Sequence, residues 1–122
     1  ALDEGDFVFV HLEAPDEAGH QGSADAKIQA IEDFDSRIVR PIVGALRHAG
    51  TDFRVVVTMD HFTPIALRTH SSDPVPTLLY DSRGTGPKSQ RRFTERECLA
   101  HDRQHGNALA QGHLLIEKLF ER

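Results

Sequence analysis

The sequence has few of the residues that mark a secreted, membrane-bound or nucleic-acid-binding protein. Its 122 residues include one cysteine, Cys98, so an internal disulfide is excluded. No apolar run approaches the roughly 18 residues of a membrane-spanning helix. Acidic residues outnumber basic ones by 19 to 14, for a formal net charge of -5, and we find no basic face that could meet the phosphates of a nucleic acid or a membrane surface. We therefore expect a cytoplasmic protein with neither kind of partner.

The start of the chain, ALDEGD, lacks the basic residues and apolar core of a secretion signal. It also lacks an initiating methionine, and an extended segment follows almost at once, so we expect an internal fragment of a longer protein. With 39% apolar and 27% charged residues, residues 1–122 fit a single domain with a modest core.

Three short segments rich in β-branched or apolar residues predict strands, over residues 6–12, 53–58 and 75–80. The second, FRVVVT, is apolar on both faces, as in a sheet with helices on each side. Between the first two strands, residues 13–23 contain Pro15, Gly19 and Gly22 and predict a loop. Residues 81–92, DSRGTGPKSQRR, predict a surface loop.

Two helical regions are expected between and after these strands. Ser23 predicts an N-cap, and a buried stripe follows at helical spacing: Ile28, Ile31, Ile38, Ile42 and Leu46. Pro41 should kink or split this helix, and Gly50 should end it. Thr94 and Glu97 form a capping-box pattern, and an amphipathic C-terminal helix is indicated by Leu109, Leu115, Ile116 and Leu119. The order of elements predicts an α/β fold.

Aspartate and histidine residues follow the predicted strands in three places. They are Asp16 and His20, then Asp60 and His61, then His70. Because ligands bind at the carboxyl ends of strands in open α/β sheets, we expect the five side chains to meet in one crevice. Carboxylate and imidazole ligands without a cysteine set suit a catalytic Zn, Mn or Fe-type site. Two ions so held would favour phosphoryl transfer.

Three motifs give this pattern a family resemblance: HLEAPDEAGH (residues 11–20), TMDHFTP (58–64) and THSSDPVP (69–76). Together they resemble the metal-binding motifs of archaeal-type, cofactor-independent phosphoglycerate mutases, in the alkaline-phosphatase-like superfamily. The chain resembles the C-terminal part of the catalytic domain of such a mutase, and the resemblance covers roughly residues 6–80. It implies part of a three-layer αβα domain with a mostly parallel sheet.

The resemblance also implies two divalent ions, Mn or alternatively Zn, Mg or Co, and no 2,3-bisphosphoglycerate. Asp16, His20 and His70 would hold one ion, and Asp60 and His61 would help to hold the other. The family's remaining aspartate ligand, its nucleophilic serine and its substrate-binding domain have no match here. We therefore expect no catalytic residue in this chain and no turnover by the chain alone.

In the intact family member, serine takes the phosphoryl group from phosphoglycerate and returns it to the other hydroxyl, interconverting 2- and 3-phosphoglycerate in glycolysis and gluconeogenesis. The alternatives are another phosphatase or phosphomutase of the superfamily, a proposed homoserine kinase, or a metal-binding module without catalysis.

Other polar residues receive weaker assignments. Lys27 and Arg68 are candidate substrate-binding residues, with an ordinary surface role as the alternative. His101 and His105 lie four residues apart and are interpreted as an exposed pair, since no carboxylate on another element accompanies them. An unpaired sheet edge would favour self-association of the chain.

Overall fold

The computed structural model describes residues 2, 4–84 and 90–121, and the chain divides into two compact units. Unit 1 comprises Ala1–Pro41 and Thr63–Ser71, and unit 2 comprises Ile42–Phe62 and Ser72–Arg122. Both contain helix, and unit 2 contains a small sheet, so the chain is a mixed helix and sheet protein.

The first helix of unit 1 lies where we predicted a loop. Helix α1 (Ala14–Gln21) has Pro15 in its first turn, and it ends at Gly22, whose φ of 73° is left-handed. Acidic Asp16 and Glu17 lie near its positive end, which stabilises it. The loop prediction is therefore wrong for Ala14–Gln21, because proline at a first turn and glycine after a last turn are helix boundary signals.

The helix predicted after Ser23 is present. The Ser23 hydroxyl accepts a hydrogen bond from the Ala26 amide at 3.3 Å, which confirms the N-cap of α2 (Ala24–Phe34). The chain stays helical through the π turn η1 (Asp35–Val39) and α3 (Arg40–Ala49) up to Gly50. Pro41 does not split the helix. The proline ring would crowd the preceding turn of a regular α-helix. Here the preceding turn is the wider π turn η1, which accommodates the ring.

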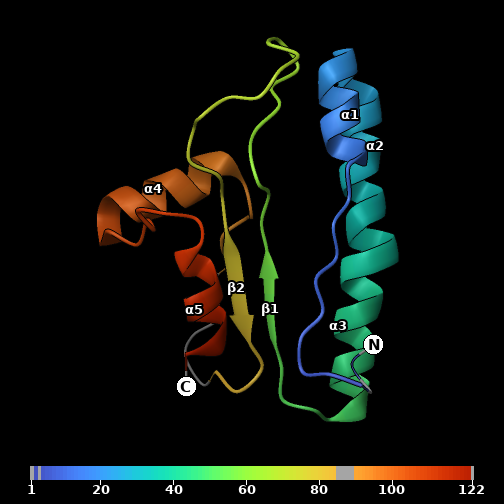
Figure 1. The fold of residues 1–122 in the computed structure, drawn as a ribbon, viewed down its shortest axis with the longest axis vertical. Helices are drawn as coiled ribbons and strands as arrows, with labels where there is room; N and C mark the ends of the chain where they lie inside the picture. Colours follow the sequence, from blue (N-terminus) through green and yellow to red (C-terminus); the bar gives the residue numbers. More distant parts are fainter. Residues whose placement is uncertain (1, 3, 85–89, 122) are drawn as a thin grey trace. The chain divides into compact units, whose positions relative to one another are not determined.

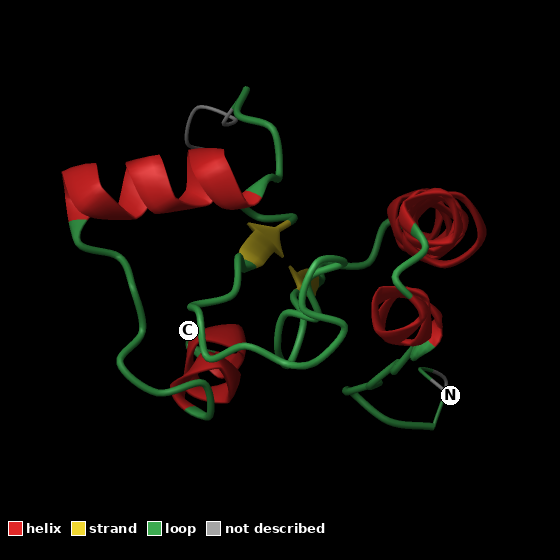
Figure 2. Ribbon diagram, turned by 90° about the horizontal axis from the view of Figure 1, so that it is seen from above, coloured by secondary structure: helices red, strands yellow, loops and turns green. Residues whose placement is uncertain are grey.

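The apolar stripe expected to be buried on this helix is half-buried at Ile38 and Leu46 and exposed at its other three positions. Ile28, Ile31 and Ile42 are exposed, and Ala18 is the one buried apolar side chain of the core among the described residues. Helix α1 packs against α2, and the two lie side by side in both views of the ribbon (Figures 1 and 2). The spacing of the isoleucines predicts an apolar helix face, but it does not indicate which element packs against that face.

Residues 6–12 form no strand, contrary to our prediction. Four consecutive apolar side chains there, Phe7 to Val10, are exposed. A strand is defined by its hydrogen bonds to a neighbouring strand, and β-branched composition alone does not provide that neighbour.

Unit 2 contains the sheet. Strands β1 (Arg54–Val57) and β2 (Leu78–Asp81) pair antiparallel, with Arg54 opposite Asp81 and Val57 opposite Leu78. The predicted mostly parallel sheet therefore differs from the antiparallel pair that the described residues form. β2 also begins later than predicted, after Pro76, which has no amide hydrogen to donate.

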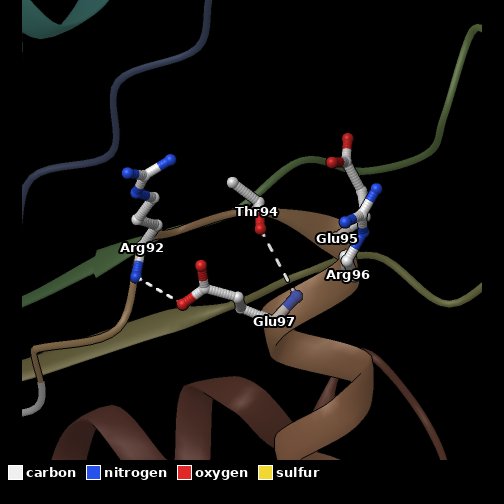
Figure 3. A pocket seen from close by; sticks show the side chains of 5 residues that line it. All are labelled: Arg92, Thr94, Glu95, Arg96 and Glu97. Carbon is white, nitrogen blue, oxygen red and sulfur yellow. Dashed lines mark hydrogen bonds between the residues drawn. The ribbon is translucent and has the colours of Figure 1, made fainter.

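Helices α4 (Glu95–His105) and α5 (Leu114–Phe120) complete unit 2. The Thr94 hydroxyl accepts from the Glu97 amide at 3.3 Å, as the capping pattern predicted, while the Glu97 carboxylate accepts from the Arg92 amide at 2.7 Å (Figure 3). α5 contacts β1, where the Arg54 guanidinium donates to the Leu119 carbonyl at 3.0 Å. Leu109 precedes α5, and part of the loop predicted over 81–92, residues 85–89, lies outside the described residues.

None of the helices in the described part of the chain is both long and apolar enough to cross a membrane.

Candidate metal centre

Three of the five predicted ligands meet within unit 1. Asp16 and His20 lie one turn apart on α1, and His70 comes from the segment Thr63–Ser71. His20 Nε2 lies 3.4 Å from Asp16 Oδ2 and 3.1 Å from His70 Nε2, and His70 Nε2 lies 3.5 Å from Asp16 Oδ1. The structure thus brings one carboxylate and two imidazoles to a common point.

These separations fit the ligand shell of a divalent ion. Ligand atoms about 2.0–2.2 Å from an ion lie roughly 3.3–3.6 Å from one another in a tetrahedron and roughly 2.8–3.1 Å in an octahedron. The three observed distances, 3.1, 3.4 and 3.5 Å, fall in this span. Two nitrogens and one oxygen are also the donor set of open, catalytic zinc and manganese sites.

A backbone carbonyl sets the tautomer of His20. His20 Nδ1 lies 2.9 Å from the Arg68 carbonyl oxygen, which can only accept a hydrogen bond, so Nδ1 carries the proton. In the neutral ring this leaves the Nε2 lone pair directed at His70 and Asp16. A metal-binding histidine is typically oriented by such a hydrogen bond from its other ring nitrogen.

The residue that supplies this carbonyl has an unusual backbone. Arg68 has a φ of 53°, in the left-handed region that residues with a side chain rarely adopt. Its guanidinium lies over Gly22, where an added Cβ would come within 2.4 Å of Arg68 Nε. The strained residue is therefore packed against the end of α1, next to the triad it helps to orient.

The two predicted substrate-binding cations make contacts inside unit 1. The Lys27 ammonium donates to the Thr63 carbonyl at 2.7 Å, and the Arg68 guanidinium packs on Gly22. Their assignment to substrate stays a prediction.

Asp60 and His61 lie in unit 2, in the loop after β1. Asp60 Oδ2 is 3.4 Å from His61 Nε2, and Asp60 Oδ1 accepts from the His61 amide at 3.0 Å. The Asp60 side chain is 66% exposed and that of His61 is 27% exposed. Within their unit they form a local pair of adjacent residues, which offers fewer ligands than the triad does.

His101 and His105 form a second pair of histidines, on α4. The rings of His101 and His105 on α4 are 4.4 Å apart, and His101 is half-buried rather than exposed. Burial, with Arg91 and His105 nearby, lowers the pKa of His101.

A surface pocket of about 310 Å³ at the start of α4 is lined by two arginines, two glutamates and Thr94 (Figure 3). Its opposed charges give no preference for a ligand of either sign.

Sequence reasoning missed Thr63. Its hydroxyl donates a hydrogen bond to Asp16 Oδ1, and it is 3% exposed. The available signal was a threonine in the same motif as Asp60 and His61, but nothing in that motif indicated a contact with α1.

Comparisons with known proteins place the chain in a family. The metalloenzyme superfamily matches residues 1–108. The 2,3-bisphosphoglycerate-independent phosphoglycerate mutase of Methanosarcina barkeri is 51% identical over 90 residues, which are 74% of this chain and 23% of that protein. The mutase of the same name from Aeropyrum pernix is 43% identical over 99 residues, 81% of this chain and 23% of that protein.

A protein of Geobacter sulfurreducens, named a probable 2,3-bisphosphoglycerate-independent phosphoglycerate mutase, is 38% identical over 122 residues, 100% of this chain and 29% of that protein. The chain thus spans about a quarter of the length of these relatives. No solved structure matches it. The match over residues 1–108 shows that the chain belongs to the metalloenzyme superfamily.

Proposed function

We propose that the chain is the metal-binding part of a 2,3-bisphosphoglycerate-independent phosphoglycerate mutase, an isomerase that interconverts 2- and 3-phosphoglycerate. The observation that carries the proposal is the meeting of Asp16, His20 and His70 at 3.1–3.5 Å. The names of the curated relatives supply the reaction.

In this proposal the triad holds one divalent ion, Mn or alternatively Zn, Mg or Co, and Asp60 and His61 contribute to a second. Bound divalent ions supply Lewis-acid stabilisation of phosphoryl oxygens. The chain's own residues orient the ligands: the Arg68 carbonyl holds the His20 ring, and the Asp16 carboxylate balances part of the ionic charge.

The nucleophilic serine, the remaining aspartate ligand and the substrate-binding domain are proposed to come from the rest of the intact protein, so the chain alone is inactive. Both units then belong to one catalytic domain of three-layer αβα architecture, in the cytoplasm. The exposed apolar residues Phe7–Val10 and the Ile28–Ile31 face would be covered there, and the isolated chain would self-associate through them.

The test is an assay of the intact protein with 3-phosphoglycerate and Mn²⁺, with formation of 2-phosphoglycerate followed by a coupled reaction. We expect His20→Ala and His70→Ala to lower kcat/KM by about 10³-fold or more, because loss of a ligand removes the ion that stabilises transition-state charge. His48→Ala is the matched control, since His48 is an exposed residue in the last turn of α3.

Phosphate release without conversion of 3-phosphoglycerate would identify a phosphatase instead. Activity unchanged in both His20→Ala and His70→Ala would contradict the ligand assignment.

A further inference from the structure

Thr63 is a buried polar residue in direct contact with the metal triad. It is 3% exposed, and its hydroxyl donates to Asp16 Oδ1. An ionised carboxylate has no hydrogen to give, so the threonine must be the donor. Hydrogen bonds from a hydroxyl to a carboxylate are short and stronger than those between neutral groups.

Contacts with both neighbouring helices hold Thr63 in place. On α1, a Cβ at Gly19 would lie 2.5 Å from the Thr63 carbonyl oxygen and 2.9 Å from its methyl carbon, so glycine permits this close approach. From α2, the Lys27 ammonium donates to the same carbonyl at 2.7 Å. Thr63 is therefore fixed relative to the helix that carries Asp16 and His20.

The direction of the hydroxyl matters for the carboxylate. Asp16 Oδ2 faces His20 Nε2 at 3.4 Å, and Oδ1 faces His70 Nε2 at 3.5 Å while it accepts from Thr63. A carboxylate has about four lone-pair positions. The hydroxyl occupies one of them and resists rotation of the carboxylate, which leaves both oxygens directed toward the histidines.

We propose that Thr63 is a positioning residue for metal binding: its buried hydroxyl, anchored by Lys27 and by close packing on Gly19, fixes the Asp16 carboxylate toward His20 and His70. The inference rests on the proposed metal site. It also gives Lys27 a role in supporting the Thr63 loop.

The test uses the 122-residue chain with Co²⁺ as the probe, whose visible absorption reports the ligand geometry. Affinity is measured by calorimetry, and folding of each variant without metal by circular dichroism. Thr63→Val removes the hydroxyl and keeps the shape, and Thr63→Ser restores the hydroxyl. We expect Thr63→Val to weaken Co²⁺ binding by about 10–100-fold and to change the absorption band, as loss of a group that orients a ligand typically does.

Thr63→Ser is expected to bind within about threefold of the unsubstituted chain, with an unchanged band. Lys27→Met provides a second variant that leaves the buried hydroxyl in place, and it should weaken binding by a few-fold. A purely structural Thr63 would instead alter folding without metal and leave the band of the bound ion unchanged.

The outcomes separate this inference from the metal site itself. If Thr63→Val keeps the affinity and the band while His20→Ala loses binding, the metal site stands and the positioning role is wrong. Equal weakening in Thr63→Val and Thr63→Ser would also overturn the role of the hydroxyl. Retained Co²⁺ binding in both His20→Ala and His70→Ala would overturn the metal site.

Discussion

The two groups of predicted ligands differ in how the chain supports them. Asp16, His20 and His70 come from a helix and a separate segment of unit 1, and the Thr63 hydroxyl and the Arg68 carbonyl orient two of them. Asp60 and His61 are neighbours in sequence, and the Asp60 carboxylate, 66% exposed, bonds to the amide next to it. A preorganised site requires several elements to converge, and within this chain that condition is met at the triad.

The largest effect is expected from removing a ligand of the triad. Titration of the chain with Mn²⁺ or Zn²⁺ should show one dominant site, and His20→Ala or His70→Ala should weaken it by about 100-fold or more, which is about 2.7 kcal/mol. The reason is that two ligands rarely hold a divalent ion against water. Calorimetry gives the affinity, with His48→Ala as control. Equal affinity in all three variants would remove the contrast between the two groups.

A smaller effect is expected from the glycine that ends α1. Gly22→Ala places a Cβ 2.4 Å from Arg68 Nε at a residue with φ of 73°. We expect it to lower the free energy of unfolding by about 1–2 kcal/mol, from left-handed strain and displacement of the guanidinium, and to weaken metal binding several-fold.

The matched control for Gly22 is Gly44→Ala on α3, where an added Cβ meets no atom within 4 Å. It should stabilise the helix by about 0.5–1 kcal/mol. Urea denaturation measures both, and a destabilisation of equal size in the two variants would argue against a specific role for the end of α1.

Unit 2 contains a cluster of charged side chains in which Arg54 and Arg83 both bond to Asp81. Hydrogen bonds from Arg83 and then Arg54 hold the pKa of Asp81 well below its usual value of 3.8. A lowered pKa in the folded state stabilises the protein above the unfolded pKa, and this contribution declines as the pH falls below about 4.

Asp81→Asn should therefore destabilise the chain at pH 7 and at pH 5, with a difference that shrinks toward pH 3. Urea midpoints at these pH values test the prediction, with metal omitted. A difference that grows on acidification would show that the sign is wrong.

The smallest effect on the dominant ion is expected from Asp60→Asn. Because Asp60 is largely exposed and bonds locally, its loss should change the affinity of that ion by about threefold or less. Calorimetry under the conditions used for His20→Ala measures it. A loss as large as that of His20→Ala would show that Asp60 belongs with the triad.

Local signals in the sequence were sufficient to predict the helix caps. Ser23 and Thr94 cap helices as predicted, and β1 lies within the predicted strand 53–58. Pattern reasoning failed where structure depends on distant partners. Residues 6–12 have strand composition but form no strand. Thr63 contacts Asp16 on α1, which lies 47 positions away in the sequence.

The residues of the candidate site could be selected from the sequence because imidazole and carboxylate groups in three motifs are chemically distinctive. Their orientation could not be predicted. It depends on an arginine with a left-handed backbone, and a sequence pattern gives no reason to expect arginine in a conformation that favours glycine.

The exposure of Phe7–Val10, Ile28 and Ile31 has a calorimetric consequence. The heat-capacity change of unfolding and the denaturant m-value both increase with the apolar surface that unfolding exposes to water. A chain of this length with an ordinary core would show a heat-capacity change of about 1.5–1.8 kcal/mol/K. The heat-capacity change of this chain should fall well short of that value, and the chain should unfold over a broad temperature range. In a larger assembly that buries those side chains, the heat-capacity change should be larger and the thermal transition narrower.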